Sequence, residues 1–246
     1  SGFLRTWDYF YNSGGWDDYP PQEHVHTEKL ATHVVPIINT ALAIRTARIM
    51  KQMAIALGED VKEFDDDIAL FSRSLQEHAW DEDAGYFGYV VHDDNGMPTD
   101  ILRHESGQNF NRGLDGLSPL HSGMCTQDQT TTMVENLMDE NHHWTSCGLS
   151  TVDRSAAYYR QDGYWNGAVW MPHQWFFWKS LIGLGYMDEA YAIAERALDV
   201  WKREVDASYN CFEHFIVETG RGAGWHQFGG LSAPVLNWFT AYHQPG

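Results

Sequence analysis

Residues 36–58 read PIINTALAIRTARIMKQMAIALG, and this stretch sets the helical character expected of the chain. Its apolar side chains recur at helical spacing, and Gly58 follows them as a stop signal, so a helix is expected from about Thr27 to Leu57. Pro36 falls near the start of the regular pattern, where a missing N–H costs little. The apolar positions are Ile37, Ile38, Leu42, Ile44, Ile49, Met53, Ile55 and Leu57.

The rest of the chain repeats this alternation of helix and long loop. Residues 1–26 are expected to be loop, because a Ser-Gly-Gly stretch and the Pro20-Pro21 pair break helices. A turn, a short strand and a second turn are expected over 80–96. Further helices are expected over 61–78, 127–139, 169–184, 187–204 and 232–242.

Long loops rich in Trp, Gly, Asp and His separate these helices, and loops of that length inside one domain are usually functional. Helical hairpins stacked in a ring, with their loops gathered at one end, would give this pattern. No linker or composition shift interrupts it. The sequence therefore predicts an all-α single domain over residues 1–246, with short β-hairpins in its loops.

Charge and composition exclude several classes of partner. The 246 residues carry a formal net charge of −18, which argues against binding to nucleic acid or to anionic membranes. No run of 18 apolar residues suggests a membrane span. The three cysteines (Cys125, Cys147, Cys211) match no metal motif, so free thiols in a reducing, cytoplasmic compartment are favoured. The 13 histidines are scattered, and no metal or cofactor is expected.

Two carboxylates stand out from their surroundings. Asp17 follows two glycines and lies between Trp16 and Tyr19, and a carboxyl packed against aromatic rings favours its protonated form. Glu213 lies in a short FEHF segment (212–215) that precedes a glycine-rich loop able to wrap around a ligand. The structural alternatives are a turn or helix cap for Asp17 and a salt-bridged structural role for Glu213.

A pair of carboxyl groups is the usual catalytic machinery for hydrolysing a glycosidic bond. One protonates the departing oxygen, and the other attacks the sugar or activates water. Aromatic residues make up 14% of the chain and can form either a core or platforms for sugar faces. The chain has no Gly-x-Ser-x-Gly elbow, phosphate loop or His-Glu-x-x-His pattern that would favour other chemistry.

Four motifs in order resemble glycoside hydrolase family 63 and its trehalase relatives. Residues 15–20 (GWDDYP) resemble the segment of the catalytic acid, which maps to Asp17. Residues 114–123 (LDGLSPLHSG) resemble a Pro-Leu-x-x-Gly stretch of that group, and residues 164–170 (YWNGAVW) resemble its Tyr-Trp-Arg-Gly-Pro-Ile-Trp stretch. Residues 212–229 resemble the segment of the catalytic base.

This resemblance implies an (α/α)6 barrel and hydrolysis with inversion at the anomeric carbon. Asp17 would be the general acid and Glu213 the general base, facing each other about 6.5–9.5 Å apart. An exo-acting hydrolase of a small α-glucoside or α-mannoside is implied, including glucosyl- and mannosylglycerate. Substrate contacts are expected from Trp16, Tyr19, Asp115, Gly116, Trp165, Asn166, Trp170, Trp225, His226 and Gln227.

An (α/α)6 barrel has twice the six helices expected here. The chain would then supply only the C-terminal half to two-thirds of the barrel, and the other helices would precede residue 1. Its open edges predict a partner segment carrying the N-terminal part of the barrel, or a homo-oligomer.

Two other functions stay open at this level. The many histidines suit a sugar isomerase or epimerase on a similar helical toroid. The half-length chain suits a non-catalytic carbohydrate-binding half-barrel. Trp165, Trp170 and the 225–227 segment also have an alternative, which is packing in the core or an unliganded loop.

Overall fold

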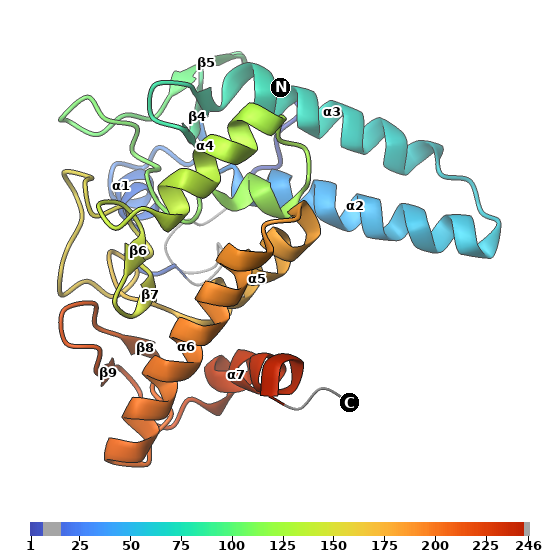
Figure 1. Ribbon diagram of the computed structural model, residues 1–246. Coiled ribbons are helices and arrows are strands. Elements are labelled where there is room, and N and C mark those ends of the chain that lie inside the picture. Colours follow the sequence, from blue (N-terminus) through green and yellow to red (C-terminus); the bar gives the residue numbers. More distant parts are fainter. Residues whose placement is uncertain (7–15, 244–246) are drawn as a thin grey trace. The chain divides into compact units, whose positions relative to one another are not determined.

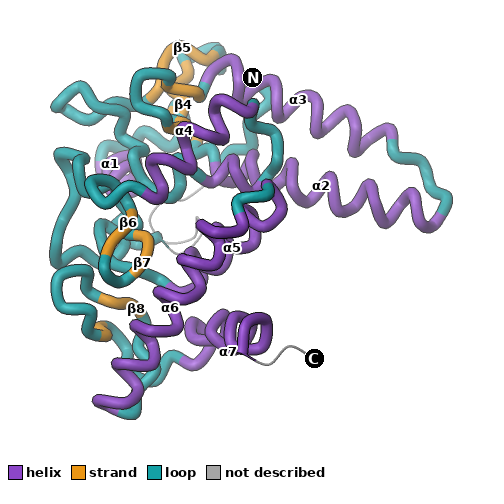
Figure 2. The backbone as a smooth tube through the Cα atoms, in the orientation of Figure 1, coloured by secondary structure: helices purple, strands orange, loops and turns teal. Residues whose placement is uncertain are grey.

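The computed structural model of the chain describes residues 1–6 and 16–243. It divides into two compact units, Ser1–Met133 and Val134–Gly246, and the boundary falls inside helix α4 (Gln127–Met138). Helices are the main regular structure of both units, and the strands are short pieces within long loops (Figure 2). The predicted helical character with hairpins in the loops is confirmed, whereas the single domain stays a prediction.

A long helical hairpin dominates the first unit. Helices α2 (Ile38–Leu57) and α3 (Lys62–His78) run alongside each other (Figure 1). Gly58 ends α2 in the left-handed conformation with φ of 75°, which confirms the predicted stop. The helix over 61–78 is confirmed to within one residue.

Two predictions for the first 37 residues are wrong. Helix α1 (Pro20–Thr27) occupies part of the predicted loop, because both prolines stand in its first turn, where no N–H is required. The helix expected from Thr27 begins only at Ile38. The residues before it include strand β1 (Val34–Val35), which pairs with a distant strand. The part of the predicted loop over 7–15 lies outside the described residues.

Short antiparallel strands complete the first unit. Strand β1 pairs with β4 (Val90–His92), which also pairs with β5 (Pro98–Ile101). Strands β2 (Trp80–Asp81) and β3 (Tyr86–Phe87) form a separate hairpin. The predicted turn before β5 is confirmed, and the Asp93 carboxylate accepts from two backbone amides in it. A 3-10 turn, η1 (Ser118–His121), follows.

Three helices pack together in the second unit. Helices α5 (Met171–Leu184) and α6 (Met187–Ser208) contact each other, and α7 (Gly229–His243) contacts both. Small side chains of α6 let the backbones approach, and Trp238 of α7 is fully buried. Two hairpins lie in the loops: β6 (Trp144–Thr145) with β7 (Gly148–Leu149), and β8 (His214–Phe215) with β9 (Gly222–Ala223). The predicted helices 127–139, 169–184, 187–204 and 232–242 are confirmed, with no end shifted by more than four residues.

None of the helices in the described part of the chain combines the length and the apolar character needed to cross a bilayer. The three cysteines are free thiols as predicted, with Cys147 buried and the other two partly exposed. Burial raises the pKa of Cys125 to about 12 and also raises the pKa of Cys147, so neither thiol is a ready nucleophile.

Candidate functional site

The turn that carries Asp17 lies in the first unit. The Tyr19 amide donates to the Trp16 carbonyl at 3.0 Å and closes the turn. Both aromatic rings are buried and meet edge to face, with centroids 4.7 Å apart, while Asp17 is exposed. The sequence led us to expect a carboxyl enclosed by these rings. Instead, the rings point into the unit, because aromatic groups gain from burial, and the polar carboxyl group of Asp17 stays in contact with solvent.

A buried polar network anchors this turn. The Tyr19 hydroxyl donates to Asn111 Oδ1 at 2.8 Å, and Asn111 Nδ2 donates to Asp115 Oδ1 at 3.3 Å. The Tyr89 hydroxyl donates to the other Asp115 oxygen at 2.9 Å. Asp115 is fully buried, and this burial raises its pKa to about 7. The hydrogen bonds from Tyr89 and Asn111 act in the opposite direction and lower the pKa by less. The network therefore links the Asp17 turn to the loop after β5 and to Tyr89, the residue before β4.

Asp115 and Gly116 were both expected to contact substrate. Gly116 is buried as well, and a Cβ on it would lie 2.1 Å from the Asn111 carbonyl oxygen. Protein groups enclose both residues in the first unit, which favours support of the Asp17 turn over direct contact with a ligand. Their role as substrate contacts stays a prediction.

Glu213 is held by hydrogen bonds in the second unit. The Tyr164 hydroxyl donates to Oε1, and the Trp225 amide donates to Oε2 at 3.1 Å. The Glu213 amide in turn donates to the Trp225 carbonyl at 3.0 Å. The carboxylate is thus fixed by two partners while its side chain stays partly exposed. Such a group is oriented and still reachable by a water or a ligand.

Gly224 is required for this arrangement. Its φ is +72°, and a Cβ at this position would lie 2.4 Å from Glu213 Oε2. A side chain there would strain the backbone and displace the carboxylate. The glycine-rich loop that the sequence singled out therefore wraps around Glu213 itself.

An aromatic cluster adjoins Glu213. The Trp165 and Trp170 rings stack with centroids 3.6 Å apart and an interplanar angle of 9°. His214 packs against Trp170, and Tyr164 meets Trp170 edge-on at 4.8 Å. Both tryptophans are buried, so among the described residues they pack in the interior beside Tyr164 rather than forming an open platform. Neither expected sugar contact is tested by this position, and both stay predictions.

Two polar atoms of this cluster lack a protein partner. Asn166 Oδ1 and His214 Nδ1 are buried, and no hydrogen-bonding group among the described residues reaches them. Buried polar atoms are normally satisfied by protein, water or ligand. Burial lowers the pKa of His214, which keeps the ring neutral near pH 7 and able to donate or accept.

The other expected contacts lie on the loop after β9. Trp225 is 59% exposed, and His226 and Gln227 are exposed beside it. The Cys211 amide donates to the His226 carbonyl at 3.2 Å, which holds this loop alongside the segment before β8. The structure therefore brings Trp225, Glu213, Trp165, Asn166 and Trp170 into one region of the second unit. Asp17 belongs to the first unit, and the predicted separation of the two carboxyl groups stays a prediction.

Sequence reasoning did not select Tyr164 or His214 as site residues. Both stand in the motifs quoted for their neighbours, and each is a polar aromatic next to a predicted residue. The tyrosine bonds a carboxylate 49 positions later in the chain. That pairing depends on the antiparallel bridge between Val169 and Phe215, which no local pattern reveals.

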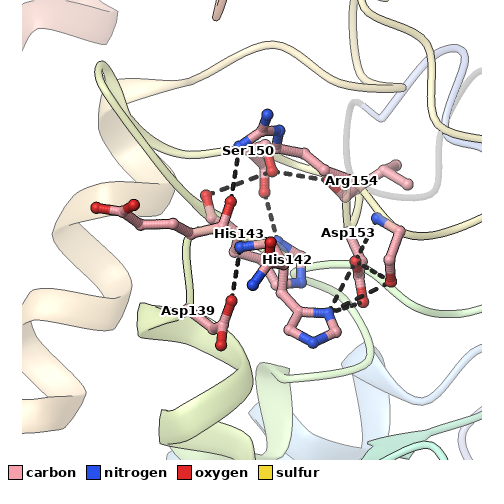
Figure 3. Close-up of polar contacts among 10 residues, drawn as sticks. Asp139, His142, His143, Ser150, Asp153 and Arg154 are labelled. Atoms are coloured by element: carbon pink, nitrogen blue, oxygen red, sulfur yellow. Dashed lines mark hydrogen bonds and ion pairs between the residues drawn. The ribbon is translucent and has the colours of Figure 1, made fainter.

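The adjacent histidines of the 139–155 loop have a structural role. Figure 3 shows the His142 ring facing the buried Asp153 carboxylate, whose oxygens lie 3.0 and 3.1 Å from Nδ1. His143 Nδ1 lies 2.8 Å from the Ser150 carbonyl oxygen. The Arg154 guanidinium donates to the Glu140 carbonyl. Nowhere in residues 1–6 and 16–243 do three His, Cys, Asp or Glu side chains gather closely enough to hold a metal ion.

A wide apolar groove of about 670 Å³ lies between α6 and α7. Trp201, Leu236 and Phe239 are among the residues that line it, and none of the predicted site residues does. Its lining has one carboxylate, Asp199, and lacks the paired acids that glycoside hydrolysis requires.

Solved structures share this fold. The chain superimposes on the GH63 mannosylglycerate hydrolase of Thermus thermophilus, in its complex with glucose, with a TM-score of 0.68, at 22% identity over 89% of this chain and 50% of that chain. Neutral trehalase Nth1 from Saccharomyces cerevisiae gives a TM-score of 0.65, at 16% identity over 86% of this chain and 38% of that chain.

Sequence comparison points the same way. Mannosylglycerate hydrolase from Rubrobacter radiotolerans is 23% identical over 208 residues, which are 83% of this chain and 43% of that protein. The chain thus spans about half the length of these relatives or less. The family model described as mannosylglycerate hydrolase MGH1-like glycoside hydrolase domain matches residues 5–229. The chain therefore belongs to the family of MGH1-like glycoside hydrolase domains.

Proposed function

We propose that this chain acts in an inverting, exo-acting glycoside hydrolase that cleaves an α-glucosidic or α-mannosidic bond in a small glycoside. Asp17 is the general acid and Glu213 the general base. The observation that carries the proposal is the Glu213 carboxylate, which Tyr164 and the Trp225 amide hold beside an aromatic cluster. The described helices would form part of an (α/α)6 toroid.

The proposed reaction needs one proton donor and one acceptor. Asp17 gives its proton to the glycosidic oxygen as the bond from that oxygen to the anomeric carbon breaks. A water attacks the anomeric carbon from the opposite face, and Glu213 takes the proton of that water. The products are a free sugar of inverted configuration and the alcohol of the leaving group. Solvent then restores the proton to Asp17 and removes it from Glu213.

The proposed substrate is a hexoside with a small polar leaving group. Two of the relatives are named mannosylglycerate hydrolases, and the one from Thermus thermophilus was solved both in complex with glucose and in complex with Tris and D-glycerate. In this chain, Asn166 Oδ1 and His214 Nδ1 are buried polar atoms that a sugar hydroxyl or a bridging water would satisfy. Trp225, which is largely exposed, can close over the apolar face of the sugar.

A panel of α-glucosides and α-mannosides, followed by proton NMR, tests the proposal. The first sugar released from an α-glycoside should be the β anomer, because a single displacement inverts the anomeric carbon. Release of the α anomer would contradict inversion. Aldose–ketose exchange without release of a leaving group would indicate an isomerase instead. Sugar binding without any turnover would indicate a non-catalytic carbohydrate-binding chain.

Replacing Tyr164 with Phe removes one of the two hydrogen bonds to Glu213 and keeps the aromatic ring. A hydrogen bond to a charged group contributes about 1.5–3 kcal/mol, so kcat/KM should fall roughly 10- to 100-fold. Steady-state kinetics on the best substrate of the panel measure the effect. Tyr209→Phe, which changes a tyrosine that is 90% exposed, is the matched control and should behave like wild type. Equal activity of the two variants would show that Tyr164 does not orient the base.

A further inference from the structure

A buried carboxylate near the end of α6 has no part in the proposed reaction. Glu204 is 2% exposed. Its Oε2 accepts from Arg221 Nε at 2.7 Å and from the Gly222 amide at 2.9 Å, and its Oε1 accepts from Arg221 Nη2 at 3.1 Å. The hydrogen bond from the Arg221 guanidinium is the main cause that lowers the pKa of Glu204 to about 2, and the hydrogen bond from the Gly222 amide lowers it further. The carboxylate is therefore ionised at any working pH, and its charge-assisted hydrogen bonds are of the strong kind.

These contacts fix the hairpin that follows Glu213. Gly222 begins β9, which pairs with β8 through His214 with Ala223 and Phe215 with Gly222. The turn between the strands is closed by the Ile216 amide, which donates to the Arg221 carbonyl at 3.0 Å. Helix α6 thus holds one strand of the hairpin through Glu204, and the other strand directly follows Glu213.

The hairpin leads straight to the hydrogen bond on the base. Gly224 and Trp225 come immediately after β9, and the Trp225 amide donates to Glu213 Oε2 at 3.1 Å. Gly224 passes so close to Glu213 that a Cβ would lie 2.4 Å from Oε2. A shift of β9 would therefore move the Trp225 donor or press the backbone against the carboxylate.

We propose that Glu204 is a positioning residue for Glu213, acting through Arg221 and the Gly222 amide to place the Gly224–Trp225 backbone against the base. The role of Glu213 as base rests on the proposed function, whereas the mechanical link from Glu204 to Trp225 does not. Glu204 touches no reacting group itself. It fixes the register of β9, and β9 fixes the donor.

The variant Glu204→Gln tests the proposal. Gln keeps the shape but turns one oxygen acceptor into an NH2 donor, which then faces the donors of Arg221 and Gly222. We expect kcat to fall about 10- to 100-fold with KM changed less than about twofold, because misplacing a catalytic group affects the transition state more than substrate binding. We also expect the Trp225 amide to exchange with deuterium faster than in wild type.

Asp206→Asn is the matched control. Asp206 pairs with Lys202 on the same helix, but both side chains are exposed, at 63% and 73%. This variant should keep wild-type kcat and wild-type exchange at Trp225. Arg221→Lys is a second test, because Arg221 is 62% exposed and Lys keeps the charge without the two-pronged contact. It should speed exchange at Trp225 and lower kcat in the same direction as Glu204→Gln.

Each outcome decides one claim. Wild-type kcat and wild-type exchange in a folded Glu204→Gln, or in Arg221→Lys if the first variant does not fold, would overturn the positioning role. Faster exchange at Trp225 with unchanged kcat would also overturn it. If wild type hydrolyses no glycoside of the panel, the proposed function fails, and the exchange measurement alone decides whether Glu204 places the Trp225 donor.

Discussion

Exchanging Glu213 for Gln is expected to lower kcat on the best α-glycoside by about 10²- to 10⁴-fold, the usual contribution of a positioned general base. Gln can still accept from Tyr164 and has nearly the same volume, so the hairpin and the aromatic cluster should stay folded. What is lost is the capacity to take a proton from the attacking water. Steady-state kinetics measure the effect, and circular dichroism checks the fold.

The control for this variant comes from the same hairpin. Glu218 is an exposed carboxylate in the turn between β8 and β9, and Glu218→Gln should be as active as wild type. The acid can be tested in the same way with Asp17→Asn against Asp18→Asn, since only the first of the two neighbours is assigned the proton transfer. Near-normal turnover by Glu213→Gln or Asp17→Asn would remove that residue from the mechanism.

The second large effect concerns stability. Asp115 has a folded-state pKa raised from 3.8 to about 7, with burial as its main cause. In the unfolded chain it ionises near its ordinary value, so between about pH 4 and pH 7 the folded state binds more protons than the unfolded state. Stability must then fall as pH rises through this window. A tenfold difference in a proton-dissociation constant corresponds to about 1.4 kcal/mol. Asp115 therefore makes the free energy of unfolding above pH 7 about 4 kcal/mol lower than it is below pH 4.

Asp115→Asn should remove this dependence. Asn cannot ionise, and it can still accept from Asn111 while the Tyr89 hydroxyl turns to accept from its amide. The variant should therefore be more stable than wild type at pH 8 and nearly equal to it at pH 4. Urea unfolding at both pH values measures the difference. Asp83→Asn, at an exposed position of the same unit, should follow the wild-type curve, and an equal pH dependence of stability in all three proteins would contradict the burial of an ionisable Asp115.

Local sequence patterns predicted the helices well and the connections between them poorly. Gly58 and Gly185 mark helix ends in the sequence, and both stand in the left-handed conformation where the helices stop. The Pro20-Pro21 pair was interpreted as a break and instead starts α1, because proline is harmful inside a helix and harmless in its first turn. Strand β1 was missed because its two valines pair with residues more than fifty positions away.

The same limit applies to the site. The glycine-rich loop after Glu213 was visible in the sequence, and Gly224 does lie against that carboxylate. The Tyr164 hydroxyl and the Glu204 carboxylate were not selected, since their partners lie 49 and 17 positions away across turns. Asp115 was expected at a ligand because of the motif around it. In the fold it is buried and bonded by Tyr89, 26 positions earlier, and by Asn111, which Tyr19 bonds from 92 positions away.

The groove between α6 and α7 has a consequence for the chain in concentrated solution. Leu236 and Phe239 are 69% and 44% exposed along it, so each copy of the chain presents an exposed apolar strip to other copies. The net charge of −18 opposes such encounters through long-range repulsion. That repulsion reaches about 30 Å at 0.01 M salt and only about 3 Å at 1 M. The salt concentration therefore decides whether charge repulsion keeps copies of the chain apart or apolar attraction brings them together.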